Sequence, residues 1–265
     1  MCELFAISSR RPTTVTFSLE TLSRHGRADR PIGDGWGVGF YDGPDARVLR
    51  EPSAIYESPW VKFIEQHGPK SNLVISHIRR VSTGSKRLAD THPFLRPLGG
   101  RMHMFAHNGN AEGIFDNPKL VPGDNRPIGG TDSEFAFCAL LNRLRNLWSG
   151  SEPPSPSDRH AVVSAFAVDL QTLGPANFLY ADSELLFVFS DRRRQSDGRF
   201  VPPGLHVLQR ECEEPLGTIG GDGVAVESEA QTILLIASVP LTDEPWRPLY
   251  EGELMMIRNG NIVAA

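Results

Sequence analysis

The sequence of 265 residues has few cysteines, no long apolar run and no excess of basic residues. Its three cysteines, Cys2, Cys138 and Cys212, are widely separated and odd in number, which excludes a disulfide framework and a CxxC metal knuckle. The longest strongly apolar run, Ile233 to Val239, is too short to span a bilayer, and the first residues show no charged n-region followed by an apolar h-region, so a signal peptide is not expected. We therefore expect a cytoplasmic protein in a reducing compartment.

Charge and missing motifs exclude further classes of function. The net charge of -5 argues against a general polyanion binder, and the run Arg192-Arg193-Arg194 lies among polar residues as an exposed loop tip would, so nucleic-acid binding is not expected. GxSxG and GxxxxGK[ST] are absent, so serine hydrolases and P-loop NTPases lack their anchors. Only His103 and His107 lie within five residues of each other among the potential ligands considered, at strand rather than helix spacing, and no metal or cofactor is expected.

A cysteine directly follows the initiator methionine. Cysteine is small enough to permit methionine removal, which would leave one residue with both a thiol and a free α-amine. Reference pKa values are about 8.5 for the thiol and about 7.7 to 8.0 for the amine, so near neutral pH the amine can take the thiol proton. The alternative is a small buried residue at the start of a strand, because Cys2, Leu4 and Ala6 alternate with Glu3 and Phe5.

Two apolar segments, Asn72 to Arg79 and Arg101 to His107, are predicted to be strands with chemically capable residues at their ends. The guanidinium of Arg79 suits a carboxylate ligand, although a local acidic residue could satisfy it equally well. Asn108 and Gly109 offer an amide donor and a flexible backbone N–H, as an oxyanion hole requires, but Asn-Gly is also a common tight turn.

The best-defined helix is predicted to begin after Thr131, because Thr131 and Glu134 form a capping-box pattern before an apolar stripe. Asp132 in its first turn is favoured by the helix dipole, and it could instead receive a ligand ammonium. A second helix is predicted over Asp158 to Leu173, after an exposed serine- and proline-rich connection. Strands precede and follow the two helices, and we expect one domain over residues 1–265.

Taken in order, Cys2, "SHIRR", "HNG" and "GTDSE" resemble the class II glutamine amidotransferase domains, which are N-terminal nucleophile hydrolases. The segments "DGWGVGFY" and "THPF" are most similar to the stand-alone, YafJ-like branch of that family. The resemblance implies an α+β fold, a four-layer αββα sandwich of two mainly antiparallel sheets. The sequence departs from the synthase-linked members at two positions: it has Arg80 where they commonly carry tryptophan, and Thr83 where they commonly carry histidine.

The resemblance also implies roles for individual residues. Cys2 would be the nucleophile and its amine the base, with an oxyanion hole at Asn108 and Gly109. The substrate-binding residues would be Arg79 for the α-carboxylate and Asp132 for the α-ammonium, with His77 and Trp36 on the same side. A structural role at the strand end is an alternative for His77.

The implied reaction is hydrolysis of glutamine or another γ-glutamyl amide to glutamate and ammonia or an amine, without a cofactor. Alternatives are a γ-glutamyl peptide or conjugate hydrolase and a catalytically silent glutamine-binding regulatory subunit. Because no synthase domain is recognised in the sequence, any ammonia acceptor is expected to be a separate subunit.

Overall fold

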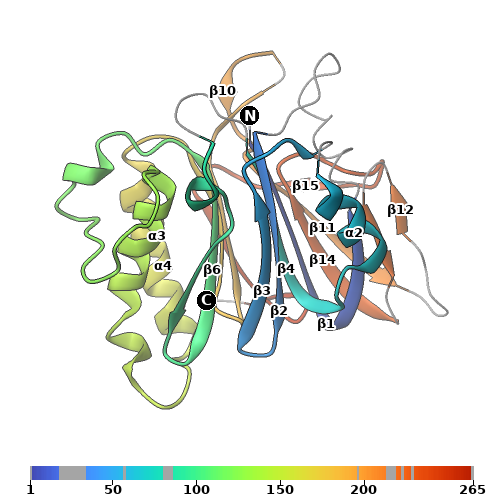
Figure 1. Cartoon of the computed structure of the whole chain (residues 1–265), viewed down its shortest axis with the longest axis horizontal. Helices are drawn as coiled ribbons and strands as arrows, with labels where there is room; N and C mark the ends of the chain where they lie inside the picture. Colours follow the sequence, from blue (N-terminus) through green and yellow to red (C-terminus); the bar gives the residue numbers. More distant parts are fainter. Residues whose placement is uncertain are drawn as a thin grey trace.

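The computed structural model describes residues 2–17, 34–55, 58–79, 86–195, 197–212, 219–221, 224–227 and 230–263 of the chain. Two antiparallel sheets pack face to face, with helices on both outer sides (Figure 1). Helices α3 (Asp132–Leu144) and α4 (Pro156–Gln171) cover the smaller sheet, and α2 (Pro59–His67) lies outside the larger one. The predicted four-layer αββα sandwich is confirmed.

The larger sheet contains the first strand of the chain near its centre, between neighbours that come from both halves of the sequence. In spatial order its strands are β15 (Arg247–Pro248), β11 (His206–Cys212), β14 (Gln231–Ala237), β1 (Glu3–Phe17), β4 (Ser71–Arg79), β2 (Gly35–Asp42) and β3 (Asp45–Glu51). The far end of β1 also pairs with β13 (Val224–Glu227), which pairs with β12 (Ile219–Gly221).

The smaller sheet is built from the middle and the end of the chain. Its strands, in spatial order, are β17 (Asn261–Val263), β16 (Glu253–Arg258), β8 (Leu186–Ser190), β7 (Ala176–Ala181), β6 (Arg101–Gly109) and β5 (Phe94–Leu98). A separate short hairpin joins β9 (Arg193–Arg194) to β10 (Phe200–Val201). Single-turn 3-10 helices are η2 (Leu88–Asp90), η3 (Ile114–Asp116) and η4 (Leu147–Ser149).

Side-chain alternation along β1 supplies two of the three hydrophobic layers. Leu4 and Ala6 pack between the sheets, whereas Phe5 and Ile7 pack on the outer side with residues of α2. A third layer fills the space between the smaller sheet and helices α3 and α4. The alternation predicted for the start of the chain is therefore present, but both of its faces are buried.

Helix α3 begins after Thr131, as predicted, with the Thr131 Oγ1 atom accepting a hydrogen bond from the Glu134 backbone N–H at 3.2 Å. The Glu134 carboxylate is directed elsewhere and accepts from the backbone N–H groups of Ile128 at 3.1 Å and Gly129 at 2.6 Å. It also accepts from the guanidinium of Arg96. Glu134 therefore holds the loop before α3 in place, a role that the capping-box pattern does not reveal.

The structure also bears on the start of α4, on the turn at Asn259 and Gly260 and on the segment near Phe17 to Ser23. Helix α4 begins at Pro156, two residues before the predicted start, because the Ser155 side chain caps it. Asn259-Gly260 is a dipeptide that predicts a type I′ hairpin turn, and the structure confirms it between β16 and β17, with φ values of 52° and 75° at these residues. The sequence also favours a short helix near Phe17 to Ser23, and this segment falls largely outside the described residues. No helix in the described ranges is both long and apolar enough to cross a bilayer.

Candidate functional site

Strand alternation directs Cys2, Arg79 and Asn108 toward the space between the two sheets. Each of these residues stands an even number of positions from a side chain packed in that space, so it lies on the same face of its sheet. The corresponding interior side chains are Leu4, Ile75 and Ala106. Residues far apart in the sequence thus meet at one end of the sandwich.

Asn108 contacts Cys2 directly. The Nδ2 atom of Asn108 donates a hydrogen bond to the main-chain oxygen of Cys2 at 2.7 Å. Asn108 is half-buried at the end of β6, and Cys2 is also half-buried. This bond brings the candidate nucleophile and the candidate oxyanion donor together across the two sheets.

Gly109 follows Asn108 at a point of close backbone packing. A Cβ atom at residue 109 would lie 1.9 Å from the carbonyl oxygen of Pro175 and 2.4 Å from Nε2 of His107. These separations are too short for any side chain, so glycine is required here by packing. The residue ends β6 in an extended ladder with β7 and is not part of a tight turn, which removes the simplest alternative for the Asn-Gly pair.

The carboxylate of Asp132 connects the start of α3 to the loop that follows Gly109. Its Oδ2 atom accepts a hydrogen bond from the backbone N–H of Ala111 at 2.8 Å, and Oδ1 accepts from the N–H of Ser133 at 2.8 Å. The two N–H donors hold a half-buried carboxylate rigidly and leave it lone pairs for a further donor.

Arg79 is buried at the end of β4, next to a group of buried histidines. The ring of His77 lies 4.2 Å from the ring of His92. Burial lowers the pKa of His77 to about 3, and the charges of His107 and Arg79 act in the same direction. Burial also lowers the pKa of His92 well below its ordinary value, and charges on His77, His107, Arg79 and Arg50 act in the same direction.

His107 directly precedes Asn108 on β6, and its Nδ1 atom is hydrogen-bonded to the hydroxyl of Ser133 at 2.9 Å. Burial lowers its pKa too, while the charge of Asp132 opposes the change. All three histidines are therefore neutral near pH 7. An imidazole with a pKa of about 3, such as His77, is too weak a base to activate a thiol efficiently at that pH.

The structure does not bring Trp36 to this group. Its indole is fully buried on the outer side of the larger sheet, in the hydrophobic layer shared with α2, and Nε1 donates to Oε2 of Glu51 at 3.2 Å. Its neighbour Gly37 lies on the other face of β2 at a close backbone approach, because a Cβ there would lie 2.1 Å from the His92 carbonyl oxygen.

Sequence reasoning missed three buried residues around Cys2, namely Glu3, Asn177 and Arg193. The prediction that residues 192–194 form an exposed tip is wrong for Arg193, which is paired with Glu3 at 2.9 Å. A local charge pattern cannot reveal a partner 190 positions away. The departures at Arg80 and Thr83 lie outside the described residues, and within the described ranges no three His, Cys, Asp or Glu side chains are grouped to hold a metal ion.

Three comparisons place this arrangement among known proteins. The family model described as class II glutamine amidotransferases matches residues 1–265. Escherichia coli strain K12 has a relative, YafJ, whose name assigns it to the glutamine amidotransferases; it is 33% identical over 262 residues, covering 96% of each chain. A crystal structure described as a predicted glutamine amidotransferase, from Pseudomonas aeruginosa, is 32% identical with a TM-score of 0.74 and full coverage of both chains.

A more distant structure supports the fold alone. The glutamine phosphoribosylpyrophosphate amidotransferase of Bacillus subtilis has a TM-score of 0.62 at 16% identity and matches 99% of this chain but 48% of its own. The family model matches the full length of the chain, and the relative from Escherichia coli and the structure from Pseudomonas aeruginosa match nearly all of it at 33% and 32% identity. On these grounds the chain belongs to the class II glutamine amidotransferase family.

Proposed function

We propose that the chain hydrolyses the γ-amide of glutamine or of another γ-glutamyl compound, with Cys2 as an N-terminal nucleophile. The observation that carries the proposal is the 2.7 Å bond between Asn108 Nδ2 and the Cys2 carbonyl oxygen. It joins a side-chain amide donor to the residue that becomes the first one when Met1 is removed. Family membership supports glutamine amide chemistry in general, and the contact supports its assignment to these residues.

In the proposed first half-reaction, the free α-amine of Cys2 takes the thiol proton and the thiolate attacks the γ-carbonyl carbon. The carbonyl oxygen becomes an oxyanion, which the Asn108 Nδ2–H and the Gly109 N–H stabilise. When the tetrahedral intermediate collapses, the C–N bond breaks and the Cys2 ammonium returns its proton to the leaving amine. The product is ammonia or an amine and a γ-glutamyl thioester on Cys2.

In the second half-reaction, the same α-amine takes a proton from water, and the hydroxide attacks the thioester carbon. The oxyanion forms again in the same place, the C–S bond breaks, and the Cys2 ammonium returns its proton to the sulfur, so that glutamate leaves and the thiol and free amine are restored. No histidine is needed as the base, in keeping with the lowered pKa values of His77 and His107.

Recognition of the substrate is proposed to depend on two opposite charges. The Arg79 guanidinium would bind the α-carboxylate, and the Asp132 carboxylate, already fixed by two backbone N–H donors, would bind the α-ammonium. His77 would support the Arg79 side as a neutral, buried neighbour and would not exchange protons with the substrate.

The test is to compare protein with and without Met1, each checked by intact mass, on glutamine and a panel of γ-glutamyl compounds. We expect the processed form to release glutamate and the Met1-retaining form to be silent, because acylation of the Cys2 nitrogen removes the base. Cys2→Ala in the processed form provides the control for contaminating activity. Equal turnover with and without Met1 would mean that the α-amine is not the base.

A further inference from the structure

A buried ion pair lies next to the candidate nucleophile in the sequence. Nη2 of Arg193 is 2.9 Å from Oε1 of Glu3, and each of the two side chains is only 5% exposed. Burial raises the pKa of Glu3, while the charge of Arg193 and its hydrogen bond oppose the change. Since Glu3 directly follows Cys2, the pair fixes the chain at the point where the nucleophile is attached.

The same guanidinium also ties Glu3 to the neighbouring strand end. Nη1 of Arg193 donates to the carbonyl oxygen of Ser238, just beyond β14. Ser238 in turn binds β1 twice: its hydroxyl accepts from the Leu4 N–H at 2.9 Å, and its N–H donates to the Leu4 carbonyl oxygen at 3.0 Å. The start of β1 is thus held through the side chain of Glu3, which pairs with Arg193, and through the main chain of Leu4, which bonds to Ser238.

A buried asparagine links the residue before Arg193 to the candidate oxyanion donor. Nδ2 of Asn177 donates to the carbonyl oxygen of Arg192 at 2.9 Å and to the carbonyl oxygen of Asn108 at 3.1 Å. Its Oδ1 atom accepts from the N–H of Asp191 at 2.7 Å. Asn177 therefore satisfies both sides of its amide while joining the β8–β9 connection to the end of β6.

These contacts close a ring that contains both candidate catalytic groups. From Cys2 the ring passes through Glu3 and Arg193, continues by the Arg192 main chain to Asn177 and Asn108, and returns through the Asn108–Cys2 bond. We propose that Arg193 and Asn177 are positioning residues that set the separation between the Cys2 thiol and the Asn108 amide. This inference rests on the proposed function, because it assigns the ring a role in that reaction.

The chemistry of the pair fits positioning. A buried ion pair is often no more stabilising than apolar residues of equal volume, so stability alone gives little reason for it. The planar fork of arginine fixes Glu3 and Ser238 in one relative geometry, which an apolar side chain cannot do. A misplacement of about 1 Å of reacting groups can lower a rate by about 10²-fold, so small shifts of Cys2 matter.

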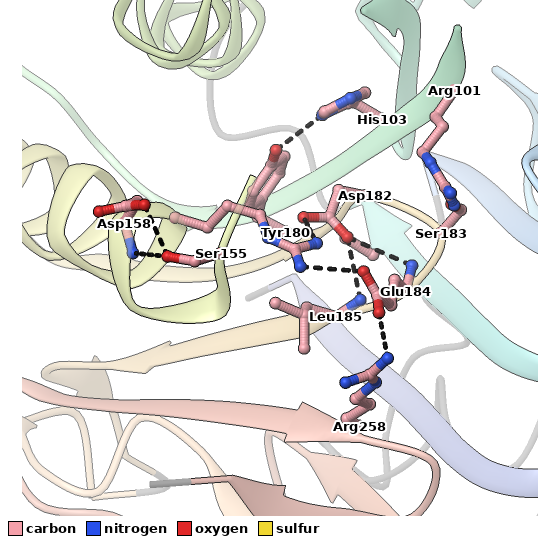
Figure 2. Close-up of polar contacts among 12 residues, drawn as sticks. Arg101, His103, Ser155, Asp158, Tyr180, Asp182, Ser183, Glu184, Leu185 and Arg258 are labelled. Atoms are coloured by element: carbon pink, nitrogen blue, oxygen red, sulfur yellow. Dashed lines mark hydrogen bonds and ion pairs between the residues drawn. The ribbon is translucent and has the colours of Figure 1, made fainter. Parts of the chain in front are cut away.

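A matched control is available at the opposite end of β7, where another buried arginine pairs with the carboxylates of Asp182 and Glu184, which are labelled in Figure 2. Arg159 is 2% exposed and is paired with Asp182 at 3.1 Å and with Glu184 at 2.9 Å. Asp182 follows the last residue of β7, whereas Asn177 lies near its first residue. Removing Arg159 therefore disturbs a comparable buried pair in the same sheet without touching the ring.

The experiment compares Arg193→Met, Glu3→Gln, their double variant, Asn177→Ala and the control Arg159→Met in processed protein. Measurements are kcat and KM for glutamine, normalised to titrated Cys2, and Tm. A further readout is the rate at which iodoacetamide alkylates Cys2. Peptide mass shows which cysteine has reacted, and Cys138 and Cys212 should react slowly because they are buried. The alkylation rate of Cys2 does not depend on whether glutamine is a substrate.

We expect Arg193→Met and Asn177→Ala to lower kcat about tenfold with little change in KM, and the double variant to be no worse than Arg193→Met alone. Both should change the alkylation rate of Cys2 several-fold, whereas Arg159→Met should lower Tm and leave kcat and alkylation unchanged. Glu3→Gln, which preserves shape, keeps the test valid if Arg193→Met does not fold.

Wild-type kcat and alkylation in the ring variants, or equal losses in Arg159→Met, would overturn the positioning role. If wild-type protein does not cleave glutamine or the γ-glutamyl panel, the proposed function fails. The alkylation rates then still decide whether the ring positions Cys2.

Discussion

Acidification should destabilise the folded chain through buried histidines that remain neutral. Burial is the main cause of a lowered pKa in all of them, namely His77, His92, His103 and His107. His103 is the most useful of these for a test, because it lies apart from the candidate site. Its Nδ1 atom is 2.7 Å from the Tyr180 hydroxyl (Figure 2), and burial lowers its pKa to about 3.

The direction of the change in folding stability follows from how many protons the folded and unfolded chains bind. Between the ordinary histidine pKa of about 6.5 and the folded value of about 3, the unfolded chain binds more protons at residue 103. The contribution of His103 to folding stability is fully present above the ordinary histidine pKa and is lost as the pH falls from that value toward the folded pKa. At about pH 5 the loss from His103 is about 2 kcal/mol, because each unit between pH 6.5 and 5 costs about 1.4 kcal/mol.

The other buried groups change the total but not the direction of the His103 contribution. His77, with a pKa of about 3, should lose a similar amount, against a typical stability of about 5–15 kcal/mol. Glu3 and Asp182 act in the opposite direction, because burial raises their pKa values. Their contribution is present below the ordinary carboxyl pKa and is lost as the pH rises, so they offset part of the histidine effect.

The assay is urea unfolding at about pH 7.5, 6 and 5 for wild type and His103→Gln, whose amide does not titrate. We expect the wild type to lose about 2 kcal/mol more than the variant between pH 7.5 and 5. Any packing cost of the substitution is common to all three pH values and cancels in this difference. Parallel stability profiles for the two proteins would refute the reasoning.

Three further predictions concern the candidate site. Asn108→Ala should lower kcat for glutamine about 10² to 10³-fold with a modest effect on KM; a variant that melts early but keeps its kcat would make Asn108 structural only. Gly109→Ala should lower Tm as well as activity, because the new Cβ would lie 1.9 Å from the Pro175 oxygen; unchanged Tm and kcat would contradict the packing requirement. Blocking the α-carboxyl of glutamine should hurt wild type about ten- to a hundredfold in kcat/KM but hardly worsen Arg79→Ala, and α-acetylation should behave likewise with Asp132→Asn. Penalties that simply add would contradict these two assignments.

Several elements could be predicted from the sequence because their signals are local. Strands β4 and β6 are short apolar runs that end in polar residues, and the start of α3 is given by one capping threonine. The helix α2 was missed although Ser58 and Pro59 are good start signals. The helix is only 9 residues long and buries Val61 and Ile64, while Trp60 and Phe63 are 50% and 51% exposed, so few residues mark its buried face.

The supporting contacts of the site could not be predicted, because they depend on pairings between distant strands. Glu3 carries no sign of its bond to Arg193, and Asn177 is an ordinary polar residue in an apolar strand. The substrate-side assignment of Trp36 failed for a related reason: its glycine-rich surroundings do not say which face of β2 is turned to the site.

Because side chains alternate between the two faces of a strand, the packing of the core determines which residues face the candidate site. Cys2 stands two positions from Leu4, and Asn108 stands two positions from Ala106, so the residues that fill the space between the sheets also set which side chains meet at one end of it. A slip of one residue in either strand would send its whole row to the opposite face. The Asn108–Cys2 bond therefore depends on correct register in both sheets, and the buried pair of Glu3 and Arg193 fixes that register where β1 begins.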